Sequence, residues 1–191
     1  MISTVVDVSA VCDNLGIAGS GAGDAYGFNI WRNTFPAEDL PAPGSSVTVA
    51  GVEFEFPARV GGNGDNIRCR GQFVTLPPGR YDWLYLLGAA ERRTEDDVEL
   101  HYADGTRRAA WLRMSDFWPD TKARFGEPEA FRAQGLRYPR HTQHGHRPAI
   151  WQQRVPVTVP GELVALRLPD NPAMHVFALT AVSDPEVRRA G

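Results

Sequence analysis

The strongest constraint on the fold is a pair of residues, Asp104 and Gly105, that separates two strand-like runs. The runs 98–102 and 106–112 flank this pair, and the first alternates apolar and polar residues with period two, as half-buried strands do. Both Asp and Gly tolerate the positive φ that a type I′ turn requires. The pattern therefore predicts an antiparallel hairpin with a type I′ turn at Asp104 and Gly105.

Similar strand-like runs recur along the rest of the chain. Residues 47–49 and 52–56 alternate on either side of Gly51. Residues 77–79, with the sequence Pro-Pro-Gly, are expected to form a turn, because proline fixes φ and has no N–H to donate. Further strands are predicted at residues 5–11, 72–76, 81–87, 150–155, 163–168 and 174–182.

Length and pattern together predict an antiparallel β-sandwich or barrel of eight or nine short strands. The chain is expected to form one domain, residues 1–191, with a short tail at 184–191. Two long loops are expected at residues 14–46 and 114–148. The second loop carries several aromatic residues, so we expect it to be ordered and packed. Residues 120–135 could hold one helix, which their glycine and proline residues would keep short.

The composition excludes several classes of protein. A net charge of −3 argues against a general nucleic-acid binder, because such proteins are usually basic. No apolar run approaches the ~18 residues of a membrane span, and residues 1–14 lack the pattern of a secretion signal. No membrane partner is therefore expected, and the expected location is cytoplasmic. Lys122 is the one lysine among 20 basic residues, which favours a bacterial source, and Cys12 and Cys69 are expected to be reduced.

Asp116 and Trp118 form the first candidate site, just after the predicted strand that contains Trp111. A carboxylate beside an aromatic ring is typical of sugar sites, because the C–H face of a sugar stacks on the indole and its hydroxyls donate to the acid. The alternative is a core tryptophan beside a solvated or capping aspartate. Core packing is favoured for Trp111 and Trp151, and ligand stacking for Trp118.

The segment 130–161 contains no Asp or Glu but is rich in arginine and histidine. Its positive field would suit a ligand that carries a carboxylate, phosphate or sulfate group. Alternatively, the acidic residues of segment 91–99 fold against it, or both segments are solvated. The basic side chains of 130–161 are Arg132, Arg137, Arg140, Arg147, Arg154, His141, His144 and His146.

Metal ligands can be suggested at two places in the sequence. The three histidines of segment 130–161 could bind a transition metal, although exposed loop histidines are the more common case. Asp7, Asp65 and Asn66 offer oxygen ligands for a structural calcium ion, but side chains of these types also stabilise tight turns. The sequence requires no other cofactor.

A series of short motifs resembles a known family. The motifs are residues 6–9 (VDVS), 13–17 (DNLGI), 64–66 (GDN), 71–72 (GQ), 76–81 (LPPGRY), 86–88 (LLG), 102–105 (YADG), 115–118 (SDFW), 168–169 (LP) and 175–180 (HVFALT). In this order they resemble the galactose-binding-like, carbohydrate-binding-module-like β-sandwich domains appended to bacterial glycoside hydrolases. The resemblance implies a jelly-roll sandwich, often with structural calcium, that binds a sugar in loops at one end or on one face. The loops 19–46 and 119–148 lie outside it.

These observations predict an all-β, antiparallel jelly-roll β-sandwich that acts as a stand-alone carbohydrate-binding-module-like protein. Its ligand would be a sugar or a glycoside-like small molecule, and the positive segment would suit an anionic one. The alternative is a small bacterial biosynthetic enzyme of the cyclase, isomerase or lyase type, in which Asp116, His141, His144 and His146 act as general acids and bases. The predicted ligand-binding residues are Trp118, Asp116, Tyr138, Arg140, His141, His144 and His146.

Overall fold

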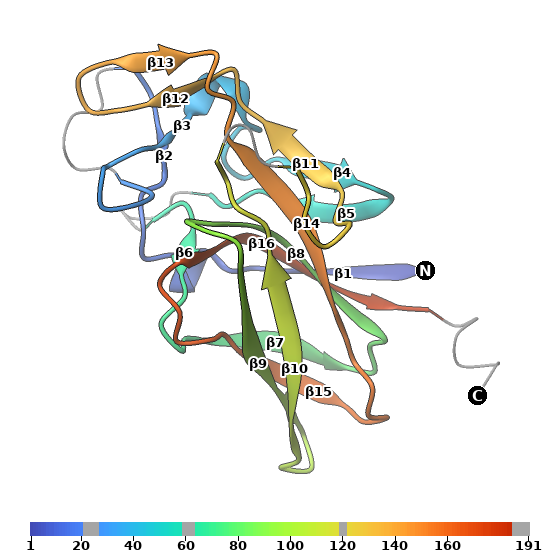
Figure 1. Ribbon diagram of the computed structural model, residues 1–191. Coiled ribbons are helices and arrows are strands. Elements are labelled where there is room, and N and C mark those ends of the chain that lie inside the picture. Colours follow the sequence, from blue (N-terminus) through green and yellow to red (C-terminus); the bar gives the residue numbers. More distant parts are fainter. Residues whose placement is uncertain (21–26, 59–63, 119–121, 185–191) are drawn as a thin grey trace.

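The computed structural model describes residues 1–20, 27–58, 64–118 and 122–184, and two antiparallel β-sheets dominate it (Figure 1). In spatial order, the six-stranded sheet contains β1 (Ile2–Val6), β16 (Met174–Ser183), β8 (Trp83–Ala90), β14 (Ala149–Pro156) and β11 (Glu129–Arg132), and β6 (Ile67–Arg68) also pairs with β16. In the same way, the four-stranded sheet contains β10 (Arg107–Met114), β9 (Thr94–Tyr102), β15 (Leu163–Arg167) and β7 (Phe73–Gly79).

The interior of the sandwich is built from side chains that alternate along the strands. Leu84 and Leu86 of β8 point inward and belong to the same buried cluster as Leu100 of β9. Burial of one leucine side chain contributes roughly 1.5–3 kcal/mol, so this shared layer holds the two sheets together. Cys12 and Cys69 are free thiols in the same layer, and burial raises the pKa of both. The predicted β-sandwich is confirmed.

A second apolar layer covers the outer face of the six-stranded sheet. Phe35 packs edge to face on Phe177 of β16, with 5.8 Å between the ring centroids. Because both faces of this sheet are covered, β16 is buried along its whole length up to Val182. The short elements around this layer are β2 (Ile17–Ala18), β3 (Phe35–Pro36), the 3-10 turn η3 (Ala37–Asp39), β4 (Ser46–Val49), β5 (Val52–Glu55), β12 (Gly135–Arg137) and β13 (Thr142–His144). Figure 1 shows β2, β3, β12 and β13 gathered at one end of the molecule.

The predicted hairpin at Asp104 and Gly105 is confirmed, but its turn is not of type I′. Strands β9 and β10 pair along the whole length of β10. Gly105 has a φ of 85°, whereas Asp104 does not adopt a positive φ. The N–H of Gly105 donates to the carbonyl oxygen of Tyr102 at 3.0 Å, and the N–H of Tyr102 donates to Thr106 at 2.9 Å. These bonds define a three-residue loop that ends in a left-handed glycine.

The prediction of a turn at residues 77–79 is wrong. Strand β7 continues through these residues, and Gly79 lies opposite Leu163 of β15. In the described chain β7 has β15 as its one neighbour, so it forms an edge of the four-stranded sheet. The register of β7 and β15 shifts between the pairs Gly79–Leu163 and Thr75–Ala165, so the two prolines lie in a β-bulge of an edge strand, where proline is tolerated.

The strand predicted at residues 5–11 and the helix suggested within 120–135 are also corrected. Strand β1 ends at Val6, because the Asp7 carboxylate accepts hydrogen bonds from the N–H and the hydroxyl of Ser9 and starts the 3-10 turn η1 (Ser9–Val11). In residues 122–135 there is no helix, since β11 and the start of β12 occupy this part of the chain. Residues 120 and 121 lie outside the described residues.

The predicted loops 14–46 and 114–148 contain more regular structure than expected. The first includes β2, β3 and η3, and the second includes β11, β12 and β13. These short strands account for most of the excess over the eight or nine strands predicted. Of the predicted tail, residues 185–191 lie outside the described residues. No helix in the described part of the chain has the length and hydropathy needed to cross a membrane.

Candidate ligand-binding groove

A groove of about 840 Å³ runs along the side of the sandwich where β10 of one sheet approaches β14 of the other. The aromatic side chains that line it are Trp83, Tyr85, Trp111 and Phe125. Its polar lining consists of Arg113, Glu127, Gln152, Gln153, Arg154 and Thr158. Most of these side chains come from β8, β10 and β14, so rigid strands position them.

The groove is open because two strand edges meet there. Strand β10 pairs with β9 alone in the described chain, and β11 pairs with β14 along Ala149–Trp151. The next residue, Gln152, donates its N–H to the carbonyl oxygen of Pro128 at 2.9 Å. Beyond it, at residues 153–156, the edge of β14 that faces away from β8 has no neighbouring strand among the described residues. This part of β14 is therefore accessible to a ligand.

An arginine guanidinium group packs against the ring of each groove tryptophan, Trp111 and Trp83. The Arg113 guanidinium carbon lies 4.9 Å from the ring centroid of Trp111, and that of Arg154 lies 4.8 Å from the ring centroid of Trp83. Such cation–π contacts orient the guanidinium groups beside the rings. Trp111 is 65% exposed. The prediction that Trp111 is a core residue is wrong, because Leu112 occupies the inward position of β10 next to it.

The polar groups that line the groove differ in how they are bonded. Glu127 is buried, and its two carboxylate oxygens accept the N–H groups of Ser115 at 3.1 Å and Phe125 at 2.8 Å. The carboxylate thus fixes the loop at one end of the groove. The side chain of Gln153 is only 6% exposed, and its Nε2 has no hydrogen-bond partner in the described structure. An unmatched buried donor of this kind lowers the stability of the fold.

Asp116 and Trp118 lie together, as their spacing suggests. The N–H of Trp118 donates to Oδ1 of Asp116 at 2.9 Å, and the Trp118 side chain is 39% exposed, edge-on to Phe117. Asp116 is half-buried, and this burial raises the pKa of its carboxyl group. Neither Asp116 nor Trp118 is part of the groove lining. Trp151 is buried, as predicted.

The other predicted site residues lie on or beside the β12–β13 hairpin. The rings of Tyr138 and His141 stack with their centroids 4.7 Å apart, and the Nε2 atoms of Gln143 and His146 lie 3.3 Å apart. His144 ends β13 and is exposed, and Arg140 is an exposed residue of the connecting loop. In the described chain no hydrogen bond or ring contact joins this group to Asp116 or Trp118. The structure thus divides the predicted site into two groups.

The acidic segment 91–99 and the basic segment 130–161 each form ion pairs with other parts of the chain. In segment 91–99, Glu91 pairs with Arg68 at 2.8 Å, and Glu95 pairs with Arg113 at 3.2 Å. In segment 130–161, Arg137 pairs with Glu38. Both segments therefore find many of their partners elsewhere in the molecule.

The weak metal candidates form hydrogen bonds within the protein, between distant segments for Asp65 and within a turn for Asp7. Asp65 accepts the N–H of Gly16 at 2.8 Å and of Ile17 at 3.2 Å, and Asn66 also donates to it at 2.8 Å. Asp7 caps the turn at Ser9. Among residues 1–20, 27–58, 64–118 and 122–184, no group of three or more His, Cys, Asp and Glu side chains is arranged to hold a metal. Calcium binding stays a prediction.

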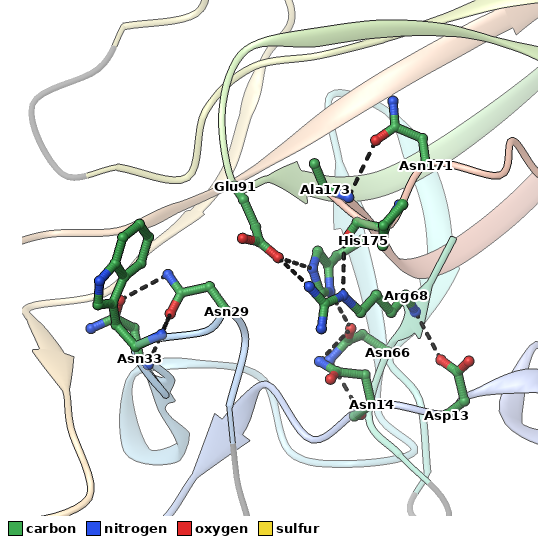
Figure 2. A network of polar contacts seen from close by, with 12 residues as sticks. Asp13, Asn14, Asn29, Asn33, Asn66, Arg68, Glu91, Asn171, Ala173 and His175 are labelled. Atoms are coloured by element: carbon green, nitrogen blue, oxygen red, sulfur yellow. Dashed lines mark hydrogen bonds and ion pairs between the residues drawn. The ribbon is translucent and has the colours of Figure 1, made fainter. Parts of the chain in front are cut away.

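A buried polar network that the sequence interpretation missed surrounds His175 (Figure 2). Its Nδ1 lies 2.8 Å from Oδ1 of Asn66, and its ring stacks on Phe28 with 3.9 Å between the centroids. Its Nε2 lies 3.7 Å from Glu91, which in turn pairs with Arg68. Burial is the main cause that lowers the pKa of His175. A histidine inside the long apolar run of β16 was the available signal, since such a residue usually needs buried polar partners.

The groove residues were missed for a different reason. Trp83 and Tyr85 alternate with Leu84 and Leu86 in the sequence, and this period-two pattern places the aromatic rings on the opposite face from the sandwich interior. The same alternation separates Trp111 from Leu112. The pattern could have identified outward aromatic residues, but the meeting of β8, β10 and β14 is a property of the fold.

A comparison with curated proteins finds no significant match. A family model described as the AziU2-like beta-sandwich domain matches residues 7–185, which include the groove and every strand of both sheets except β1. The match agrees with the two-sheet architecture described above. The chain therefore belongs to the family of AziU2-like beta-sandwich domains.

Proposed function

We propose that this chain is a binding domain whose groove takes up a sugar ring or a sugar-like small molecule. The observation that carries the proposal is Trp111, which is 65% exposed on the wall of the groove. Its large apolar surface gains little from folding, and a ring stacked on it would remove that surface from water.

The chemistry of the groove fits a ligand that is apolar on its faces and polar at its edge. Trp83 and Trp111 offer indole surfaces, while the two arginines offer donors to hydroxyl oxygens. The volume of about 840 Å³ lies within the usual range of roughly 300–1,000 Å³ for small-molecule sites. The proposal keeps the ligand class implied by the resemblance to carbohydrate-binding modules. It differs in the location of the site, which lies at the side of the sandwich. Of the predicted loop 114–148, residues 125–128 line the groove.

Replacement of Trp111 tests the proposal. We expect saturable binding of at least one member of a panel of common hexoses, hexuronic acids and their methyl glycosides, measured by isothermal titration calorimetry. Trp111→Ala should weaken that binding by at least about tenfold, because the stacking surface is removed. Phe73→Ala is the matched control. Phe73 is 54% exposed on the same four-stranded sheet, and the Arg167 guanidinium group packs against its ring. Phe73 lies outside the groove.

Two results would contradict the proposal. The first is a panel without any saturable binding, and the second is an equal loss of affinity in Trp111→Ala and Phe73→Ala. The bound sugar should also be recovered unchanged by mass spectrometry. Chemical conversion that is lost in Asp116→Asn would favour the enzyme alternative, for which the raised pKa of the Asp116 carboxyl is the supporting observation.

A further inference from the structure

We propose that the ligand of the groove is an anionic sugar, a uronic acid, and that Arg154 binds its carboxylate. This inference rests on the proposed function and adds the charge of the ligand and the residue that recognises it. It follows from how the charged groups of the groove are paired.

Arg154 is an exposed cation in the groove without an acidic partner in the described structure. No carboxylate oxygen of the described residues lies within ion-pair distance of its guanidinium group. Arg113 differs, because it pairs with Glu95 at 3.2 Å. The acid that lines the groove, Glu127, has both oxygens occupied by backbone N–H groups. The groove therefore presents a positive charge that its own acidic groups leave unpaired.

The contact with Trp83 orients the Arg154 guanidinium group for binding a planar anion such as a carboxylate. Arg154 lies opposite Tyr85 in the register of β14 and β8, and Trp83 lies two residues away on the same face of β8. Its guanidinium group rests over the Trp83 ring, with 4.8 Å from the carbon to the centroid. A guanidinium held in this way has less freedom to lose when it binds, and its N–H groups can donate to a carboxylate in a bidentate manner.

A single unpaired arginine matches a single negative charge. A carboxylate carries one charge, whereas a phosphate monoester carries about 1.5 to 2 at neutral pH and would need a second free cation. Arg113 is the other arginine of the groove, and Glu95 already neutralises it. The charge balance thus favours a uronic acid over a sugar phosphate.

The test compares acids with their neutral counterparts on the intact chain. Isothermal titration calorimetry at low salt would use D-galacturonate and D-glucuronate, D-galactose and D-glucose, and galactose 6-phosphate as the phosphate probe. We expect at least one uronate to bind about tenfold or more tightly than its neutral sugar, because a charge-assisted bond to arginine is stronger than a neutral one. Arg154→Gln should reduce this ratio to about one. Arg167→Gln, a variant of the arginine over Phe73 outside the groove, should preserve it.

The possible results separate this inference from the proposed function. Equal binding of uronates and neutral sugars, weakened by Trp111→Ala, would overturn the anionic ligand and leave the sugar-binding groove intact. Tighter binding of the phosphate probe, or a uronate preference that survives in Arg154→Gln, would overturn the role of Arg154 toward a carboxylate. Failure of every sugar to bind would overturn both. Arg154 is exposed, so its variant is expected to fold, and its circular dichroism spectrum and Tm verify this.

Discussion

The groove and the buried network around His175 both place polar side chains against aromatic rings, but they differ in how those side chains are paired. In the network, Arg68 pairs with Glu91, and Nδ1 of His175 contacts Asn66, whereas Nε2 of His175 has no hydrogen-bond partner among the described residues. In the groove, the exposed Arg154 has no acidic partner among the described residues. A charge that is paired inside the protein stabilises the fold, whereas an unpaired charge at an accessible edge is available to a ligand. The following predictions test this distinction.

Removal of the His175 ring should give the largest effect on stability. The side chain is fully buried, stacks on Phe28 and contacts Asn66, so His175→Ala should lower the free energy of unfolding by about 3–5 kcal/mol. Urea denaturation followed by circular dichroism measures this change. Arg154→Ala serves as the control and should change stability by less than about 0.5 kcal/mol. Comparable losses in the two variants would contradict the distinction between network and groove.

Lower pH should destabilise the network around His175. Burial and Arg68 lower the pKa of His175 in the folded chain, against the opposing influence of Glu91 and Asp13. The unfolded chain therefore binds a proton more readily, so the stability contributed by neutral His175 is complete above pH about 6.5 and declines below it. Between pH 7.5 and 5.5 we expect a loss of up to about 1.4 kcal/mol.

Urea denaturation across this pH range measures the slope, and it should be smaller in His175→Gln. The exposed His144 provides a matched variant, His144→Gln, whose slope should equal that of the unchanged chain. A flat profile between pH 7.5 and 5.5 would show that His175 keeps its ordinary titration in the folded state.

Replacement of Gln153 should produce the smallest effect and one of opposite sign. Gln153→Met keeps the length of the side chain but removes the unpartnered Nε2, so stability should rise by about 1 kcal/mol. The Tm measures this gain. Gln152→Met is the control: its Nε2 donates to the carbonyl oxygen of Val49 at 3.0 Å, so that variant should lose stability. A loss in Gln153→Met as well would mean that Nε2 of Gln153 is satisfied within the protein.

The sequence predicted those features that depend on neighbours along the chain. The hairpin at Asp104 and Gly105 and the contact between Asp116 and Trp118 are of this kind, because two or three residues determine them. The groove depends on β8, β10 and β14, which are far apart in the sequence, so no local pattern shows that Trp83 and Trp111 line one cavity. The error at Pro77 has the same origin, since only the strand order shows that β7 lies at an edge.

That edge also bears on how copies of this protein behave beside one another. An exposed strand edge can pair with the edge of a second molecule and extend a sheet between molecules. Pro77 and Pro78 interrupt the row of N–H donors in β7, and both are exposed. The β-bulge and the two prolines together break the regular row of donors that a strand from another copy would need. The two prolines therefore oppose aggregation through the four-stranded sheet at high protein concentration.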